Sequence, residues 1–247
     1  MKLRIYHNRI WLLAFMVGFF VTCQSEEKKS EKTMDMGEEF RLLGYENPTI
    51  SWDLNNFNSI VGYGQPIDHI PYTDIIGGEN ITTISIQNGA LVEFSLAKFP
   101  RLEILNLKGN KLKVIISMEN SKNLNHIDLS ENRLGSIPEI SGLYTLNNLK
   151  ELDLSGNFLP MLDPSFDKLD NLKVLKLGNN KIIHFPLVLL KMKSLEEVDL
   201  SYNSLTKIPE KLEKKDNLKY LDVTGNDLEI NEVEQLRKML PNTTVIF

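Results

Sequence analysis

One short phrase returns six times between Leu102 and Ile230, and this repetition constrains the fold more than any other feature of the chain. Each copy fits L-x-x-L-x-L-x-x-N-x-L-x-x-I, with exchanges among Leu, Ile and Val. A period of 22 to 25 residues separates the copies, which begin at Leu102, Leu124, Leu149, Leu172, Leu195 and Leu218. A fixed period of this length is typical of a solenoid, because each unit can bury its apolar face only on its neighbours.

Apolar and polar residues alternate at the start of every copy. In the third copy, Leu152 and Leu154 are separated and flanked by polar residues. Period-two alternation predicts a short strand with one buried face, and stacked copies predict a parallel sheet. On the return path, 163–169 reads "DPSFDKL", an N-cap Asp followed by Pro, which favours a short helix or 3₁₀ turn on the opposite side.

The repeated phrase closely resembles the leucine-rich repeat family. The resemblance implies an α/β solenoid, a right-handed horseshoe with a parallel β-sheet on its concave face and short helices or 3₁₀ turns on its convex face. It also implies a structural asparagine ladder that points inward and bonds turn backbone. The ladder residues are Asn110, Asn132, Asn157, Asn180, Asn203 and Asn226. A polar residue repeated among leucines needs hydrogen-bond partners, so we interpret the ladder as scaffold and not as a binding site.

Atypical units are expected at both ends, because a solenoid must cover the exposed edges of its core. A divergent copy opens at Ile81, which makes about seven repeats at 81–230. We predict an N-terminal cap at 40–80, with a small separate functional segment as the alternative. We predict a C-terminal cap at 231–247, with a helix that begins in a near capping box at Asn231 and Glu234 and stops at Pro241. We expect no catalytic or membrane domain after it.

The N-terminus has the pattern of an export signal. Residues 1–22 combine a basic start with the apolar run "IWLLAFMVGFFV" at 10–21, which is short for a membrane-spanning helix. Cys23, the single cysteine, follows at once, and its position resembles a bacterial lipoprotein signal, in which this residue carries the lipid. The alternatives are an ordinary signal peptide that contains Cys, or an uncleaved anchor. Residues 23–39 are mostly charged or small and predict a flexible tether.

These N-terminal features predict a protein that is exported and lipid-anchored to a bacterial membrane, at the outer membrane or the cell surface. The sequence leaves the oligomeric state open.

Three side chains per copy point away from the buried strand face, and we expect them to form the concave surface. The centre column is acidic apart from Lys176, which predicts a groove that attracts a basic protein or peptide. The alternative is that Asp is habitual at this position in the family and needs no ligand. The candidate contact residues are His126, Asp128, Glu151, Asp153, Lys176, Glu197, Asp199, Tyr220 and Asp222.

Other function classes find little support in the sequence. A net charge of −5 argues against general nucleic-acid binding, and the four scattered His residues and single Cys predict no metal site. We predict no cofactor and no enzymatic activity. The function expected is a membrane-anchored protein-binding module; the alternatives are a structural envelope protein without a specific ligand, or a substrate-recognition subunit of an enzyme.

Overall fold

The computed structural model describes residues 20–22, 39–43, 52–64, 67–70, 75–135 and 141–247. Most of the predicted signal, the lipidation candidate Cys23 and nearly all of the predicted tether lie outside these residues. Thr22 closes a short strand that precedes Cys23.

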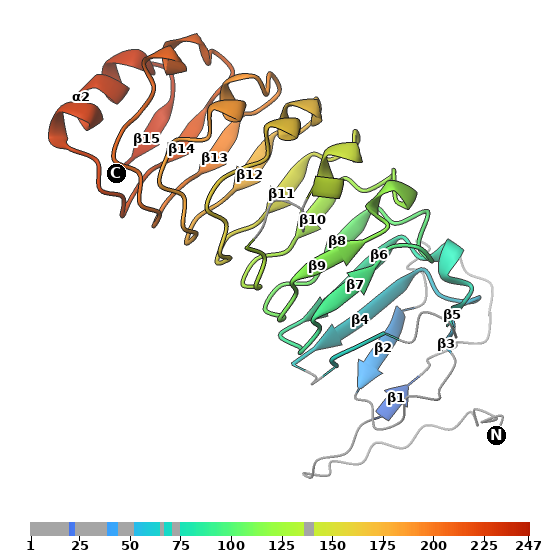
Figure 1. The fold of residues 1–247 in the computed structure, drawn as a ribbon. Helices are drawn as coiled ribbons and strands as arrows, with labels where there is room; N and C mark the ends of the chain where they lie inside the picture. Colours follow the sequence, from blue (N-terminus) through green and yellow to red (C-terminus); the bar gives the residue numbers. More distant parts are fainter. Residues whose placement is uncertain (1–19, 23–38, 44–51, 65–66, 71–74, 136–140) are drawn as a thin grey trace, which may run out of the picture.

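One long sheet runs through the whole described chain (Figure 1). Its neighbouring strands are parallel, except that β1 is antiparallel to β2. Equivalent residues of successive copies pair in register, so Ile127 lies between Leu105 and Leu152. In order the strands are β1 (Phe20–Thr22), β2 (Glu39–Leu43), β4 (Ser59–Tyr63), β6 (Thr83–Gln87), β8 (Ile104–Asn106), β10 (His126–Asp128), β11 (Glu151–Asp153), β12 (Val174–Lys176), β13 (Glu197–Asp199), β14 (Tyr220–Asp222) and β15 (Thr244–Ile246).

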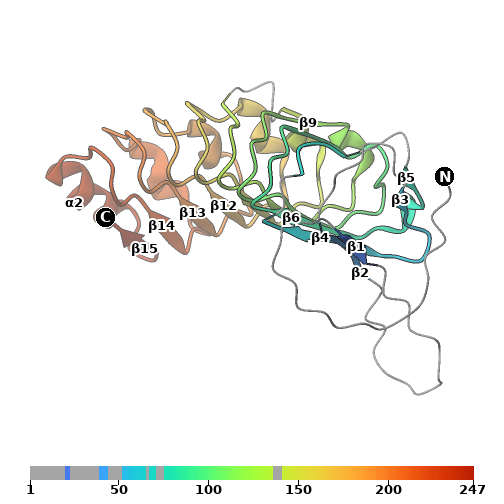
Figure 2. The ribbon, with the colours of Figure 1, turned by 90° about the horizontal axis from the view of Figure 1, so that it is seen from below.

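Short 3₁₀ helices and two small sheets form the side opposite the long sheet (Figure 2). The predicted cap of η5 is present: the Asp163 carboxylate accepts a hydrogen bond of 2.7 Å from the Ser165 N–H, and Pro164 begins the helix. The small sheets pair β3 (Trp52–Asp53) with β5 (Ile75–Ile76), and β7 (Glu93–Ser95) with β9 (Val114–Ile116). The 3₁₀ helices are η2 (Gly78–Asn80), η3 (Met118–Asn120), η4 (Ser141–Thr145), η5 (Pro164–Lys168), η6 (Leu187–Leu190) and η7 (Glu210–Lys214). The predicted α/β solenoid is thereby confirmed.

The apolar positions of the phrase form one continuous core. In the first full copy, Leu102, Leu105, Leu107 and Leu112 are all buried, and the other copies follow the same pattern. Stacking therefore removes from water the face that a single unit would leave exposed, which is the main stabilising contribution in this architecture.

The ladder asparagines lie inside the turns that follow the strands. The Asn157 side chain accepts a hydrogen bond of 3.0 Å from the Leu134 N–H of the preceding coil. Its amide donates to the Leu129 carbonyl of that coil and to the Leu154 carbonyl of its own coil, both at 3.0 Å. The other five ladder residues make the same set of contacts. Each side chain thus joins two coils through backbone groups.

One residue in the turn after each strand from β4 to β14 adopts a left-handed conformation, a feature absent from the sequence predictions. In the six ladder coils it directly precedes the asparagine. Its φ lies between +50° and +70° in all eight coils. Gly meets this demand without strain, and Asn tolerates it better than most residues. The residues are Gly64, Asn88, Gly109, Glu131, Gly156, Asn179, Tyr202 and Gly225.

The C-terminal helix differs from its predicted start. Helix α2 (Ile230–Met239) is capped by Glu229, so the capping box predicted from Asn231 is wrong. Asn231 lies inside the first turn, where its side chain accepts from the Glu232 N–H at 2.9 Å. Leu236 and Leu240 are buried, and β15 adds the last strand to the sheet.

The region predicted as an N-terminal cap continues the solenoid. Strand β4 pairs with β6 over five register positions, and β2 pairs with β4 over four. Residues 40–80 therefore supply strands of the same sheet, within the part of the chain that the structure describes.

Candidate functional site: the concave face

The concave face is formed by the strand side chains that point away from the core. The nine predicted contact residues all lie on it, on strands β10 to β14, at the first or the middle outward position of each strand. Pairing in register puts Asp128, Asp153, Lys176, Asp199 and Asp222 in one column across the sheet. The strands thus bring together residues that lie 23 to 25 positions apart in the chain.

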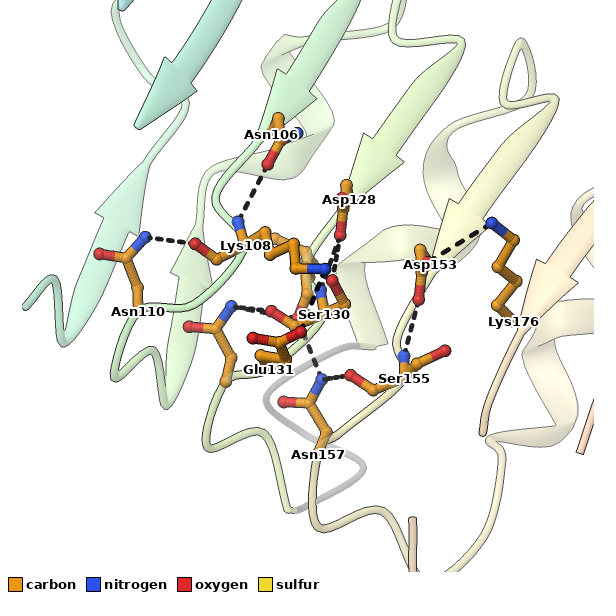
Figure 3. A network of polar contacts seen from close by, with 12 residues as sticks. Asn106, Lys108, Asn110, Asp128, Ser130, Glu131, Asp153, Ser155, Asn157 and Lys176 are labelled. Carbon is orange, nitrogen blue, oxygen red and sulfur yellow. Dashed lines mark hydrogen bonds and ion pairs between the residues drawn. The ribbon is translucent and has the colours of Figure 1, made fainter. Parts of the chain in front are cut away.

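Each acidic residue of the centre column also has a structural contact. One Asp153 oxygen, Oδ1, accepts a hydrogen bond of 2.9 Å from the Ser155 N–H at the end of the strand. Asp128 accepts an equivalent bond at 2.9 Å and Asn106 at 3.1 Å (Figure 3). Asp199 and Asp222 do so at 2.8 and 2.9 Å. Side-chain to backbone bonds of this kind stabilise a turn, so one oxygen of each carboxylate is engaged within its own coil.

Two lysines form ion pairs with carboxylates in and beside the acidic column. Lys176 Nζ lies 3.8 Å from Asp153 Oδ2, and Lys108 Nζ lies 3.0 Å from the Glu131 carboxylate (Figure 3). The hydrogen bond and charge of Glu131 raise the pKa of Lys108 above its usual value. Both pairs are partly exposed, so they contribute little to stability and can exchange for a charged ligand.

The first outward column holds less regular residues. His126 Nε2 lies 3.3 Å from the Glu151 carboxylate on the next strand. The Tyr220 hydroxyl donates to Asp222 Oδ2 at 3.3 Å, and burial, followed by the charge of Asp222, raises the pKa of the Tyr220 phenol. Ile104 in the same column is 41% exposed, which places an apolar side chain on an otherwise polar face.

Gly178 allows side chains of the next coil to approach closely in the middle of the face. A Cβ there would lie 2.9 Å from both Asp199 Oδ2 and Ser201 Oγ. The carboxylate and hydroxyl of the neighbouring coil therefore lean over the glycine, next to Lys176. Nothing in the periodic pattern of the sequence indicated this close approach.

The concave face is longer than the sequence predicted. Strand β4 carries Ser59, Val61 and Tyr63 in register with the outward residues of β6, and the Tyr63 side chain is 68% exposed. The alternation in "SIVGY" was the available signal, but the segment lacks the ladder asparagine.

A second row of polar residues lies at the opposite end of the strands. Asn148 donates to the Lys122 carbonyl of the coil before it at 2.9 Å, and Asn171 and Asn217 repeat the bond. Asn148 and Asn171 line an open cavity of about 470 Å³ together with Glu103, Asn123, Asn125 and Lys150. The backbone contacts identify this row as a second, exposed ladder.

The described residues of the concave face form no recognisable catalytic or metal-binding site. Across the described residues, no group of three His, Cys, Asp or Glu side chains could hold a metal ion. In the same residues, no helix is long and apolar enough to cross a bilayer.

Comparison with known proteins assigns the repeats. A family model described as Leucine Rich repeats (2 copies) matches residues 193–238, and a Leucine Rich Repeat model matches 123–143 and 148–169.

Two human proteins illustrate the sequence relatives. Volume-regulated anion channel subunit LRRC8B is 38% identical over 91 residues, which is 35% of this chain and 11% of that protein. Ras suppressor protein 1 is 34% identical over 68 residues, which is 28% of this chain and 24% of that protein. The chain thus covers well under half the length of either relative.

Solved structures resemble most of the described chain. A leucine-rich repeat protein of Leptospira interrogans matches with a TM-score of 0.62 and 25% identity, covering 78% of this chain and 55% of that one. Internalin C2 of Listeria monocytogenes matches with a TM-score of 0.64 and 20% identity, covering 78% and 82%. The internalin likeness shows the fold alone.

Proposed function

We propose that this leucine-rich repeat protein is a non-enzymatic binding module that holds a basic protein or peptide on its concave face. Leucine-rich repeat domains commonly bind other proteins, and their fold is typically a scaffold without catalytic activity. The proposal includes export and attachment to a bacterial membrane through a lipid on Cys23, at the outer membrane or cell surface. The protein would then present the solenoid from a membrane by a tether of residues 23–39.

The observation that supports this proposal most directly is the column of partly exposed carboxylates on strands β10, β11, β13 and β14. Oδ1 of each Asp bonds its own turn, so each Oδ2 is held in place before a ligand arrives. A preorganised acceptor loses little conformational freedom on binding a Lys or Arg side chain. Tyr220 and Ile104 supply the aromatic and apolar surface that interfaces use for affinity.

The test is titration of a lysine-rich peptide with the purified protein. Asp153→Asn with Asp199→Asn keeps the Oδ1 acceptors and removes two charges, so the fold is preserved and affinity should fall roughly 10-fold. Asp170→Asn with Asp227→Asn removes the same charge from exposed sites off the face and serves as the control. Equal losses for both pairs, or no saturable binding, would refute the concave site.

Salt separates this electrostatic binding from apolar binding. Affinity for the peptide should decrease as ionic strength rises, because the contacts are partly exposed and screened within about 8–10 Å. An affinity that stays constant from low to high salt would contradict an acidic recognition surface.

The lipid anchor has its own test. Cys23→Ala should move the protein from the membrane fraction to the soluble fraction of cells that produce it, because the acylation site is lost. Retention of the variant in the membrane fraction would show that another element, such as the apolar run before Cys23, holds it there.

A structural envelope protein without a specific ligand is the second candidate. The observation that favours it is the same set of Oδ1 contacts, because they give each Asp a structural role. A recognition subunit of an enzyme is a third possibility of the fold. If substitutions on the concave face changed the result of no binding assay, the structural role would be favoured.

A further inference from the structure

The chain segments that follow the first five ladder residues form a surface with a charge opposite to that of the concave face; the segment after Asn226 carries Asp227 and Glu229 and lies outside this surface. We call this surface the carboxyl edge, because it begins where the strands end; Figure 1 shows the turns as a row along one side of the solenoid. It comprises 111–114, 133–135, 158–161, 181–184 and 204–207. These segments contain five Lys or Arg and no Asp or Glu, in a chain with 28 basic and 33 acidic residues.

The basic side chains of the carboxyl edge are exposed and available for an anionic partner. Among the described residues, none of them forms an ion pair; the paired lysines, such as Lys108 and Lys176, lie elsewhere. The basic residues are Lys111, Lys113, Arg133, Lys181 and Lys207.

Apolar side chains project from the middle of the same edge. Phe158 is 47% exposed, Met161 is 50% exposed and Ile183 is 54% exposed, and all three lie on two adjacent coils. Lys181 Nζ lies 4.8 Å from the centre of the Phe158 ring, in a cation–π contact. Single exposed apolar residues are ordinary, but three together inside a basic rim indicate an interaction surface.

We propose that the carboxyl edge docks on an anionic lipid surface. Projecting aromatic and aliphatic side chains flanked by Lys and Arg match the requirements of a bilayer interface, where apolar groups enter the headgroup region and cations contact lipid phosphates. The cavity of about 470 Å³ lies at the other end of the strands, and the carboxyl edge presents projecting side chains. A bilayer, unlike a peptide, needs no groove.

Docking by the carboxyl edge would complement the proposed lipid on Cys23. A lipid on Cys23 would hold the chain at a membrane, and a basic patch is a recognised second signal that would orient the solenoid there. The solenoid would then lie with its carboxyl edge on the membrane and its acidic concave face turned to a partner. The docking itself does not require concave-face binding.

The first test measures partition of the full chain onto phosphatidylcholine vesicles with and without phosphatidylglycerol. Lys111→Gln with Arg133→Gln and Lys181→Gln should weaken binding to the anionic vesicles about 100-fold, since each surface cation contributes roughly 5-fold. The control removes the same charge from exposed sites off the edge, by Lys122→Gln with Lys150→Gln and Lys193→Gln. The N-terminal apolar run is common to all three proteins. Equal losses for both triple variants, or no loss, would overturn the proposal.

The second test reports on the edge itself, whatever the N-terminus does. Ile183→Cys in a Cys23→Ser background gives one site for an environment-sensitive dye. Its emission should shift to the blue with anionic vesicles and not with neutral ones. No shift would overturn the proposal, and a shift caused by a polyglutamate peptide and not by vesicles would assign the edge to acidic proteins. Asp153→Asn with Asp199→Asn should leave the lipid response unchanged, which separates this result from a failure of the concave-face proposal.

Discussion

The regular coils from β8 to β14 and the coils of β4 and β6 before them share one sheet but hold their turns differently. In both regions the left-handed residue donates its N–H to the next coil: Gly64 to the Gln87 carbonyl at 2.8 Å, and Gly109 to the Ser130 carbonyl at 3.0 Å. The regular coils add the asparagine side chain, which joins two coils. The N-terminal pair has instead five-residue strands, paired over five positions where the regular strands pair over three.

The comparison distinguishes the contacts that every turn needs from the contacts that only the regular repeats make. A left-handed residue and an inter-coil backbone bond occur in both regions, so they are the common requirement. The asparagine ladder adds side-chain bonds between coils to the backbone bonds that both regions make after the strand. The comparison makes three predictions.

Removing a ladder asparagine should have the largest effect. Asn157→Leu leaves the Leu134 N–H without an acceptor and removes one of the two amide donors of the Leu129 and Leu154 carbonyls, which keep Asn132 and Asn180. At 1–3 kcal/mol for the unsatisfied N–H and about 1 kcal/mol for each lost carbonyl bond, the cost is about 4 kcal/mol in total. Chemical denaturation measures the loss. Asn148→Leu, which deletes one bond of the exposed row, is the matched control and should cost under about 1 kcal/mol. Similar losses for both would mean that the inner ladder has no special role.

Substitutions at two glycines of the N-terminal region should separate the cost of a steric clash from the cost of backbone strain. Gly77 has a φ of 78°, and a Cβ there would lie 2.4 Å from the Asn55 backbone nitrogen, so Gly77→Ala should destabilise the protein by about 3 kcal/mol. Gly64 has a φ of 65° and nothing within 4 Å, so Gly64→Ala should cost only about 1 kcal/mol. The unfolding midpoints of the two variants measure the two losses of stability. A loss for Gly64→Ala as large as for Gly77→Ala would show that the turn at Gly64 has constraints beyond its φ angle.

The smallest effect concerns a buried lysine in the last regular coil. Lys215 is 8% exposed at a position that is Met192 in the coil before it, and its ammonium donates to the Met192 carbonyl. Burial lowers the pKa of Lys215 to about 8. Between about pH 8 and the unfolded value of 10.5 the unfolded chain binds more protons, so stability should rise with pH in this window and be flat below it.

Lys215→Met should therefore stabilise the protein by about 1 kcal/mol at pH 7 and abolish the rise. Denaturation of both proteins from pH 7 to pH 10.5 provides the measurement. An unchanged rise in the variant would assign the pH dependence to another group.

Much of the fold was predictable, while the details of the site were not. The leucine positions, the strands from Ile104 onward and the cap at Asp163 all followed from local patterns, and the structure bears them out. The start of α2 was mispredicted because Asn231 satisfies the usual capping composition, yet its side chain bonds within the first turn. The strand at 59–63 was missed because its coil has no asparagine to mark it.

The candidate site shows the same division. Alternation was enough to place the acidic column on one face. Its charge balance depends on pairs between coils, such as Lys176 with Asp153, and the need for a glycine at 178 depends on the close approach of Asp199 from the next coil. Such contacts arise between residues more than 20 positions apart, and no local pattern encodes them.

Periodicity along the chain was therefore sufficient to define a stack of coils with a leucine core, because that pattern depends only on spacing and polarity. Packing between coils decided the rest: the left-handed turns at Glu131 and Tyr202, the second role of each Asp, and the gathering of Phe158 and Ile183 within a basic rim. The physical reason is that neighbouring coils bring together side chains one full period apart, and their distances exist only after the stack has formed.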